Sequence, residues 1–121
     1  LTGVIVVTQP QEVAVSDALR SVAMFETLNV PILGIVENMT GDFFGEGGGE
    51  RLANERNVPF LGRVPLDAEV RKGGDYGRPI VISAPETAAG QAFEALAKTV
   101  AARVSVVMLQ SPDVIPLNVI E

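Results

Sequence analysis

Apolar residues in the first third of the chain follow two periods, one after the other. Residues 3–8 form a short, continuous apolar run rich in β-branched side chains, typical of a strand covered on both faces of a parallel sheet. Over residues 12–28 the apolar positions recur every three or four residues, which predicts an amphipathic helix. Pro31 prevents this helix from continuing into a second apolar run at 32–36. Strand, helix and strand in this order predict a right-handed βαβ unit.

A second unit repeats this plan. Glycines cluster at 45–49, in a turn that leads into a short helical stretch at 50–56. Asn29 and Asn57 stand where the two helices should end, because asparagine tolerates the left-handed conformation found after a helix C-terminus. Residues 60–64 then predict a third strand, so the βαβ pattern continues.

The last third of the chain predicts a small edge element and the longest helix. Residues 66–72 indicate a turn or short helix, and 79–82 a brief final strand, at a sheet edge because of its proline. Thr87 is a suitable N-cap for an apolar helical repeat over 87–104. We therefore expect an α/β fold, a Rossmann-like, three-layer αβα domain with about four parallel strands over 1–104. Residues 105–121 are expected to form a tail that is extended, docked or partly disordered.

Composition and charge narrow the possible partners. The 121 residues are 47% hydrophobic and 20% charged, which fits one folded domain. The net charge of -6 argues against nucleic acid and anionic membranes as partners. Cysteine and histidine are both absent, which excludes thiolate and imidazole chemistry. No targeting or membrane-spanning segment is visible, so we expect a cytoplasmic protein, and the start at Leu1 leads us to expect further sequence upstream.

Two glycine-rich motifs resemble phosphate-binding loops, and neither fits. The Lys-Gly-Gly at 72–74 lacks the Lys and Ser or Thr that must follow the last glycine of a P-loop, since Arg78 and Pro79 stand there. We interpret this segment as a turn before the last strand. The glycines at 45–49 fail as a dinucleotide-binding fingerprint, because Glu50 replaces the final glycine. They predict a flexible helix entry, and a close backbone approach to a ligand stays open.

The candidate binding site follows from topology. In open α/β sheets ligands bind outside the carboxyl ends of the strands, and residues 9–11, 37–39 and 65–67 follow the three predicted strands. The amide of Asn38 offers donors and an acceptor that complement the edge of adenine, and Pro65 and Leu66 can supply an apolar wall. An asparagine after a strand is also an ordinary turn residue, so both interpretations stay open on this evidence alone.

Six ordered segments resemble the Mrp family of ParA- and MinD-type P-loop ATPases. The segments are Val-Thr-Gln-Pro-Gln (7–11), Asn-Val-Pro-Ile-Leu-Gly-Ile-Val-Glu-Asn-Met (29–39), Phe-Gly-Glu-Gly-Gly-Gly (44–49), Val-Pro-Phe-Leu-Gly (58–62), Val-Pro-Leu-Asp (64–67) and Gly-Arg-Pro-Ile-Val (77–81). The resemblance implies an iron–sulfur cluster carrier, with a homodimer that sandwiches two ATP molecules. It also implies apo-proteins that accept iron–sulfur clusters as partners.

The resemblance also implies a nucleotide site beyond the carboxyl ends of the three predicted strands. Its residues would be Gln9, Pro10, Asn38, Pro65, Leu66 and Asp67. On this resemblance Asn38 contacts adenine, residues 65–67 form the rest of the base and ribose pocket, and residues 9–11 lie near the phosphates.

Two departures from the family pattern limit what can be carried over. The Walker A loop, the magnesium-binding aspartate and the switch region of the family precede the equivalent of Leu1. We therefore expect an intact parent to use ATP with Mg²⁺, and this chain alone not to hydrolyse ATP. Cluster-carrying members place Cys-x-x-Cys between the Glu-Asn-Met and Phe-Gly-Glu segments, where this chain has Thr-Gly-Asp-Phe at 40–43. Because iron–sulfur clusters are held by thiolates, cluster ligation is not carried over.

Two other functions stay open beside the cluster carrier. One is a positioning or regulatory ATPase of the ParA and MinD kind, which the absent cysteine pair favours. The other is a non-catalytic interaction domain built on the same scaffold. The residue-by-residue match of the six segments favours the iron–sulfur cluster carrier.

Overall fold

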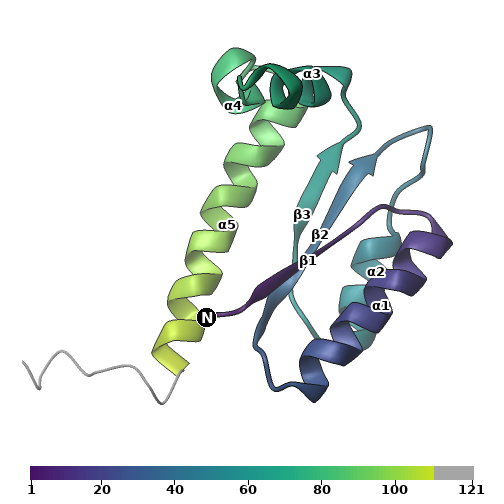
Figure 1. The fold of residues 1–121 in the computed structure, drawn as a ribbon, viewed down its shortest axis with the longest axis vertical. Coiled ribbons are helices and arrows are strands. Elements are labelled where there is room, and N and C mark those ends of the chain that lie inside the picture. Colours follow the sequence, from purple (N-terminus) through teal and green to yellow (C-terminus); the bar gives the residue numbers. More distant parts are fainter. Residues whose placement is uncertain (111–121) are drawn as a thin grey trace, which may run out of the picture.

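The computed structural model describes residues 1–110, which form a three-stranded parallel sheet covered by helices on both faces (Figure 1). Eight elements follow one another along the chain. They are β1 (Val4–Thr8), α1 (Glu12–Thr27), β2 (Ile32–Thr40), α2 (Gly48–Arg56), β3 (Phe60–Pro65), α3 (Ala68–Tyr76), α4 (Ile80–Ser83) and α5 (Ala88–Gln110). The strand order β1-β2-β3 confirms the two consecutive βαβ units that the sequence predicts.

One face of the sheet is covered by α1 and α2. Their apolar sides meet β1 and β2 in a core of buried residues: Val6, Ala18, Val22, Ile35, Leu52 and Ala53. Asn29 and Asn57 both end their helices in the left-handed conformation, with φ of 57° and 55°, as predicted. The amphipathic spacing of the two helices thus has its expected effect, since it places their apolar stripes on the sheet.

The other face is covered unevenly. Helix α5 packs against β3 and reaches β2, and the hydroxyl of Thr87 accepts the N–H of Gly90 at 3.1 Å, as expected of an N-cap. Figure 1 shows α5 beside β3, and the strand order β1-β2-β3 puts β1 on the opposite edge of the sheet. On this face of β1, Ile5 and Val7 are exposed. The edge and one side of β1 therefore have no cover within residues 1–110.

The predicted fourth strand is wrong. Residues 79–82 belong to the single-turn helix α4, so the sheet of the described residues has three strands. The carbonyl of Pro79 accepts the N–H groups of Ile82 and Ser83 at 2.9 and 3.0 Å, which closes the turn. Ile80 is buried here, where α4 packs against α3 and α5. The apolar, β-branched residues at 80–82 suggested a strand, but the burial of Ile80 against neighbouring helices accounts for their apolar character.

Two boundaries differ from the sequence prediction. Strand β2 runs four residues past 36, because β3 offers it partners as far as Thr40, opposite Pro65. Helix α5 continues to Gln110, so the predicted extended conformation of residues 105–110 is wrong. The remaining part of the predicted tail, 111–121, lies outside the described residues.

The Lys-Gly-Gly motif at 72–74 lies inside α3 and is not the turn that we expected. A Cβ atom on Gly73 would lie 2.3 Å from the carbonyl oxygen of Arg78, so only glycine lets the returning chain approach this closely. Gly77 ends α3 with a φ of 72°, in the left-handed region. The motif therefore ends a helix, and it forms no phosphate-binding loop.

No helix within residues 1–110 is both long and apolar enough to cross a membrane.

We predict that the uncovered side of β1 drives self-association of the chain. An open strand edge beside exposed valine and isoleucine side chains pairs readily with another chain. A Val7→Lys substitution should lower the weight-average mass measured by sedimentation velocity, without changing the far-UV circular dichroism spectrum. Val13→Lys, at an exposed position of α1, is the matched control and should behave like the parent chain. Equal masses for both variants would show that β1 is not the associating surface.

Candidate functional site

The residues at the carboxyl ends of the three strands lie at one edge of the sheet. Residues 37–39, which we expected to follow the second strand, lie within the last part of β2, because β2 pairs with β3 as far as Thr40. Along β2, Glu37 lies opposite Thr8 of β1, and Asn38 lies opposite Val64 of β3. The N–H of Leu66 donates to the carbonyl of Thr40 at 2.9 Å, which ties the ends of β2 and β3 together. The prediction that Asn38 and Pro65 lie on the same rim is therefore confirmed.

Asn38 already makes one local contact. Its side-chain oxygen accepts the backbone N–H of Met39 at 3.0 Å, and Met39 has a φ of 60°. This contact lies within β2, at the register shift between Asn38 and Thr40, so Asn38 is not the turn residue that the sequence left open as an alternative. Within residues 1–110 the amide nitrogen of Asn38 has no acceptor, and the side chain is half-buried. The rim thus offers a hydrogen-bond donor, and a two-point contact with a base would need the oxygen to be shared with Met39.

The segment after β3 combines an apolar side chain with a helix cap. Leu66 is exposed at the rim. Asp67 accepts the N–H of Glu69 at 2.8 Å and so caps α3, which leaves its other carboxylate oxygen for further contacts.

The segment after β1 is packed more tightly. Pro10 is buried, and the amide nitrogen of Gln11 donates to the side-chain oxygen of Gln9 at 2.9 Å. The side-chain oxygen of Gln11 is buried without a hydrogen-bond partner among the described residues. These two glutamines stand at the start of α1, where free backbone N–H groups favour an anion.

A residue that the sequence reasoning did not assign to the site organises this rim. The side chain of Glu37 is 0% exposed, although it carries a carboxylate. Its oxygens accept the N–H of Gly47 at 3.0 and 3.1 Å, the N–H of Gly49 at 3.0 Å, and the Nε–H of Arg63 at 2.9 Å. The carboxylate therefore occupies the N-terminus of α2, where the helix dipole favours negative charge.

The glycine-rich segment is what allows this contact. Gly47 has a φ of 104°, in the left-handed region. A Cβ atom on Gly48 would lie 2.3 Å from the carbonyl oxygen of Pro10, and one on Gly49 would lie 3.0 Å from the Cβ of Glu37. The glycines thus serve the close approach of α2 to the ends of β1 and β2. Gly48 and Gly49 are therefore needed for the packing of the chain against itself.

Arg63 connects the buried carboxylate to two exposed ones. Its side chain is 29% exposed and pairs with Glu37, with Glu46 at 3.3 Å, and with Glu50. The hydrogen bond to Glu50 is the largest cause that raises the pKa of Arg63, burial opposes it, and Glu37 raises the pKa further. The contribution of Arg63 to stability is therefore complete at neutral pH and is lost only when the pH rises through that raised pKa.

A tight hairpin stands where the family resemblance places a cysteine pair. Gly41 and Gly45 exchange two backbone hydrogen bonds of 3.0 and 2.8 Å directly after β2. Between them Phe43 is 80% exposed, and its ring meets that of Phe44 edge-to-face with centroids 4.8 Å apart. The described residues contain no group of three or more His, Cys, Asp or Glu side chains that could hold a metal ion.

We predict that the buried carboxylate is the most costly side chain of the rim to remove. Glu37→Ala leaves the N–H groups of Gly47 and Gly49 without an acceptor and removes the buried partner of Arg63, so it should lower the free energy of unfolding by about 3–5 kcal/mol. Glu46→Ala removes a 63% exposed partner of the same arginine and should cost less than about 1 kcal/mol. Urea denaturation followed by circular dichroism measures both. Similar losses for the two variants would show that the rim does not depend on Glu37.

Comparisons with known proteins agree with this architecture. The chain is similar to the iron–sulfur cluster carrier protein of Synechocystis sp. (46% identity over 90% of this chain and 34% of that protein). It is also similar to the carrier of Deinococcus radiodurans (43% over 97% and 36%) and that of Escherichia coli (40% over 96% and 33%). The chain thus spans about a third of the length of these relatives.

Solved structures of MinD share the fold. The septum site-determining protein MinD of Pyrococcus horikoshii, complexed with Mg-ADP, superimposes with a TM-score of 0.73 at 28% identity, over 85% of this chain and 42% of that chain. The cell division ATPase MinD of Pyrococcus furiosus gives a TM-score of 0.72 at 27% identity, over 81% and 41%.

A family model matches residues 1–101 under the description "ParA: NUBPL iron-transfer P-loop NTPase". This match covers most of the chain and includes all three strands and the rim residues that follow them. The chain therefore belongs to the ParA family of NUBPL-type iron-transfer P-loop NTPases.

Proposed function

We propose that this chain forms the adenine side of the ATP site in an iron–sulfur cluster carrier ATPase. The observation that carries the proposal is the meeting of Asn38 with Pro65 and the residues after it at one rim of a parallel sheet. Open α/β sheets bind ligands at such a rim. The carrier function is proposed because the relatives are iron–sulfur cluster carrier proteins. ATP is proposed as the ligand because the MinD of P. horikoshii, which has the same fold, was solved in complex with Mg-ADP.

The proposed site takes its parts from three segments. The amide nitrogen of Asn38 donates to the base, and Pro65 and Leu66 form an apolar wall beside it. Asp67 lies next to the ribose, and residues 9–11 lie toward the phosphates, near the free N–H groups at the start of α1. The 121 residues contain no Walker-type loop, so phosphate and Mg²⁺ binding are assigned to the remainder of a protein of the relatives' length. Mg²⁺ bound there would neutralise phosphate charge during ATP hydrolysis.

We predict weak but specific adenine-nucleotide binding by the isolated chain. Without a phosphate loop the dissociation constant for ATP should be about 1 mM or weaker, which corresponds to roughly 4 kcal/mol. Titration of ¹⁵N-labelled protein should shift the backbone amides of Asn38, Leu66 and Asp67, and phosphate release should be absent. GTP should shift them less, because its base presents a different pattern of donors and acceptors.

Two variants make this titration decisive. Asn38→Ala should abolish the adenine-dependent shifts, and Asn54→Ala, at an exposed position of α2, should leave them unchanged. Micromolar affinity, or magnesium-dependent hydrolysis that Asn38→Ala abolishes, would show that this chain holds a complete nucleotide site. Equal shifts in the parent chain and Asn38→Ala would contradict the adenine role of Asn38.

The iron–sulfur cluster is treated in this proposal as cargo. The sequence has no cysteine and no histidine, so its residues do not fit the usual ligand set of such a cluster. Cluster ligands are therefore assigned to other parts of the protein or to its partners. A homodimer, apo-protein acceptors of the cluster and a cytoplasmic location complete the proposal.

We predict that anaerobic reconstitution with ferrous iron and sulfide leaves the isolated chain without a protein-bound chromophore. The physical reason is the absence of thiolates, which supply most of the affinity for iron–sulfur clusters. Visible absorbance and iron analysis after gel filtration measure the outcome. A stoichiometric cluster that elutes with the protein would overturn this assignment of the ligands.

A positioning or regulatory ATPase is the second candidate. It is favoured by the likeness to MinD and by the hairpin that stands in place of a cysteine pair. In this case the nucleotide would control dimerisation on a partner or surface, and no cluster would be carried.

A further inference from the structure

We propose that the pocket between α3, α4 and α5 binds a segment of a partner protein that carries a large apolar side chain within two residues of a carboxylate. This inference goes beyond the proposed function, since it requires neither a nucleotide nor a cluster. It rests on the apolar pocket, on apolar side chains exposed beside it, and on an arginine next to it that has no acidic partner within residues 1–110.

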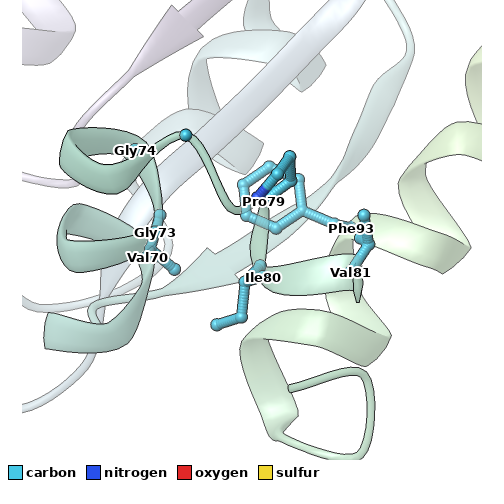
Figure 2. A pocket seen from close by; sticks show the side chains of 8 residues that line it. Val70, Gly73, Gly74, Pro79, Ile80, Val81 and Phe93 are labelled. Atoms are coloured by element: carbon cyan, nitrogen blue, oxygen red, sulfur yellow. The ribbon is translucent and has the colours of Figure 1, made fainter. Parts of the chain in front are cut away.

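The pocket lies between the three C-terminal helices (Figure 2) and has a volume of about 360 Å³. Its walls are mostly apolar. They come from Val70 of α3, from Pro79, Ile80 and Val81 at the start of α4, and from Phe93 of α5. Desolvated apolar pockets of this kind hold the anchor residues of protein interfaces.

Two glycines keep the pocket open. Gly74 and Gly77 both line it, and a Cβ atom at either position would meet no other atom within 4 Å. Gly77 also ends α3 in the left-handed conformation, which explains its presence. Gly74 lies inside α3, where glycine destabilises the helix relative to alanine. Within residues 1–110 nothing fills the space at Gly74, so the space suits an occupant from another molecule.

Large apolar side chains are exposed beside the pocket. Tyr76 precedes the lining residue Gly77 and is 80% exposed, and Ile82 follows the lining residue Val81 and is 72% exposed. Val81 itself is 43% exposed. Exposed apolar side chains around an apolar pocket are typical of surfaces that bind other proteins, and tyrosine is frequent among the residues that contribute most to such binding.

Arg78 determines the chemistry of the partner. It is exposed and stands between two residues that line the pocket. Its backbone N–H donates to the carbonyl of Gly73 at 2.7 Å, so the backbone from which its side chain projects is fixed. Within residues 1–110 its guanidinium has no carboxylate partner, whereas Arg71 and Lys72 of α3 each have one. An unpaired arginine beside an apolar pocket selects a carboxylate next to the apolar anchor.

The charges around the pocket favour a protein segment over a membrane or a nucleic acid. Carboxylates stand on α3, on α5 and in the loop before α5: Glu69, Asp75, Glu86 and Glu94. A membrane or a nucleic acid would bring many negative charges against them, whereas a single carboxylate can pair with Arg78. Successive Cα atoms are about 3.8 Å apart, so the carboxylate must lie within about two residues of the anchor to reach this arginine.

Subtractive peptide selection tests the proposal on the full chain. A phage library of random dodecapeptides is first depleted on the Gly74→Leu chain and then selected on the parent chain. The leucine side chain of this variant fills the pocket, and leucine favours a helix more than glycine does, so α3 should persist. Depletion removes peptides that bind elsewhere, including those that bind the open edge of β1. The selected peptides should share a large apolar residue with Asp or Glu within two positions of it.

Circular dichroism verifies the fold of the Gly74→Leu chain before the depletion. If that variant does not fold, Val81→Lys takes its place, because this position is exposed and needs no additional room.

Fluorescence anisotropy with a labelled selected peptide then measures the contribution of the charge. Arg78→Glu should weaken binding by about tenfold or more, because it opposes two carboxylates. Arg20→Glu, at an exposed position of α1, carries the same change of charge and should bind like the parent chain. A peptide with lysine in place of its carboxylate should bind the Arg78→Glu chain about tenfold better than the parent chain, since opposite charges again face each other.

The proposal is overturned if no sequence is enriched, if the enriched peptides lack the shared carboxylate, or if Arg78→Glu and Arg20→Glu bind the peptide equally. It is also overturned if no peptide is selected and Gly74→Leu lowers the mass of the chain in sedimentation velocity, since the pocket would then hold a second copy. Binding to vesicles that contain phosphatidylserine, abolished by Arg78→Glu, would assign the surface to a membrane instead.

Discussion

Glu37 holds a carboxylate near the carboxyl end of the central strand, and its side chain has no exposure to solvent. Such a burial is unfavourable unless the charge is hydrogen-bonded on every side, and here two N–H groups of α2 and the guanidinium of Arg63 satisfy it. The partners come from two elements, the start of α2 and β3. One side chain thus fixes the start of α2 and the end of β3 relative to β2, and the geometry of the rim depends on it.

The functional segments are arranged around this carboxylate. Asn38 is the next residue of the chain, so the backbone from which it projects is fixed by the contacts of Glu37. The glycines that bring α2 onto the carboxylate also bring it onto Pro10, which couples the segment after β1 to the segment after β2. Removing the carboxylate would therefore disturb the proposed nucleotide site without touching any residue that meets the ligand.

The same rim shows how one member of the ParA family differs from its cluster-carrying relatives. A hairpin closed by two backbone hydrogen bonds carries an aromatic tip where the resemblance places thiolates. An exposed ring provides apolar contact area and no metal ligand, so Phe43 cannot replace the thiolates that hold a cluster.

The sequence by itself determined the three strands, the helices between them, their asparagine caps, and the shared rim of Asn38 and Pro65. These features depend on local periodicity and on the order of elements along the chain, both of which are visible in the residues. Tertiary structure alone decided that residues 79–82 form a helical turn and that β2 continues to Thr40. It also decided that the carboxylate of Glu37 is buried against the N-terminus of α2. Each of these depends on a partner distant in sequence: the α3 and α5 surfaces for Ile80, the edge of β3 for β2, and Arg63 for Glu37. A buried charge and an apolar turn have no local pattern, because their stability comes from groups that only the folded chain brings together.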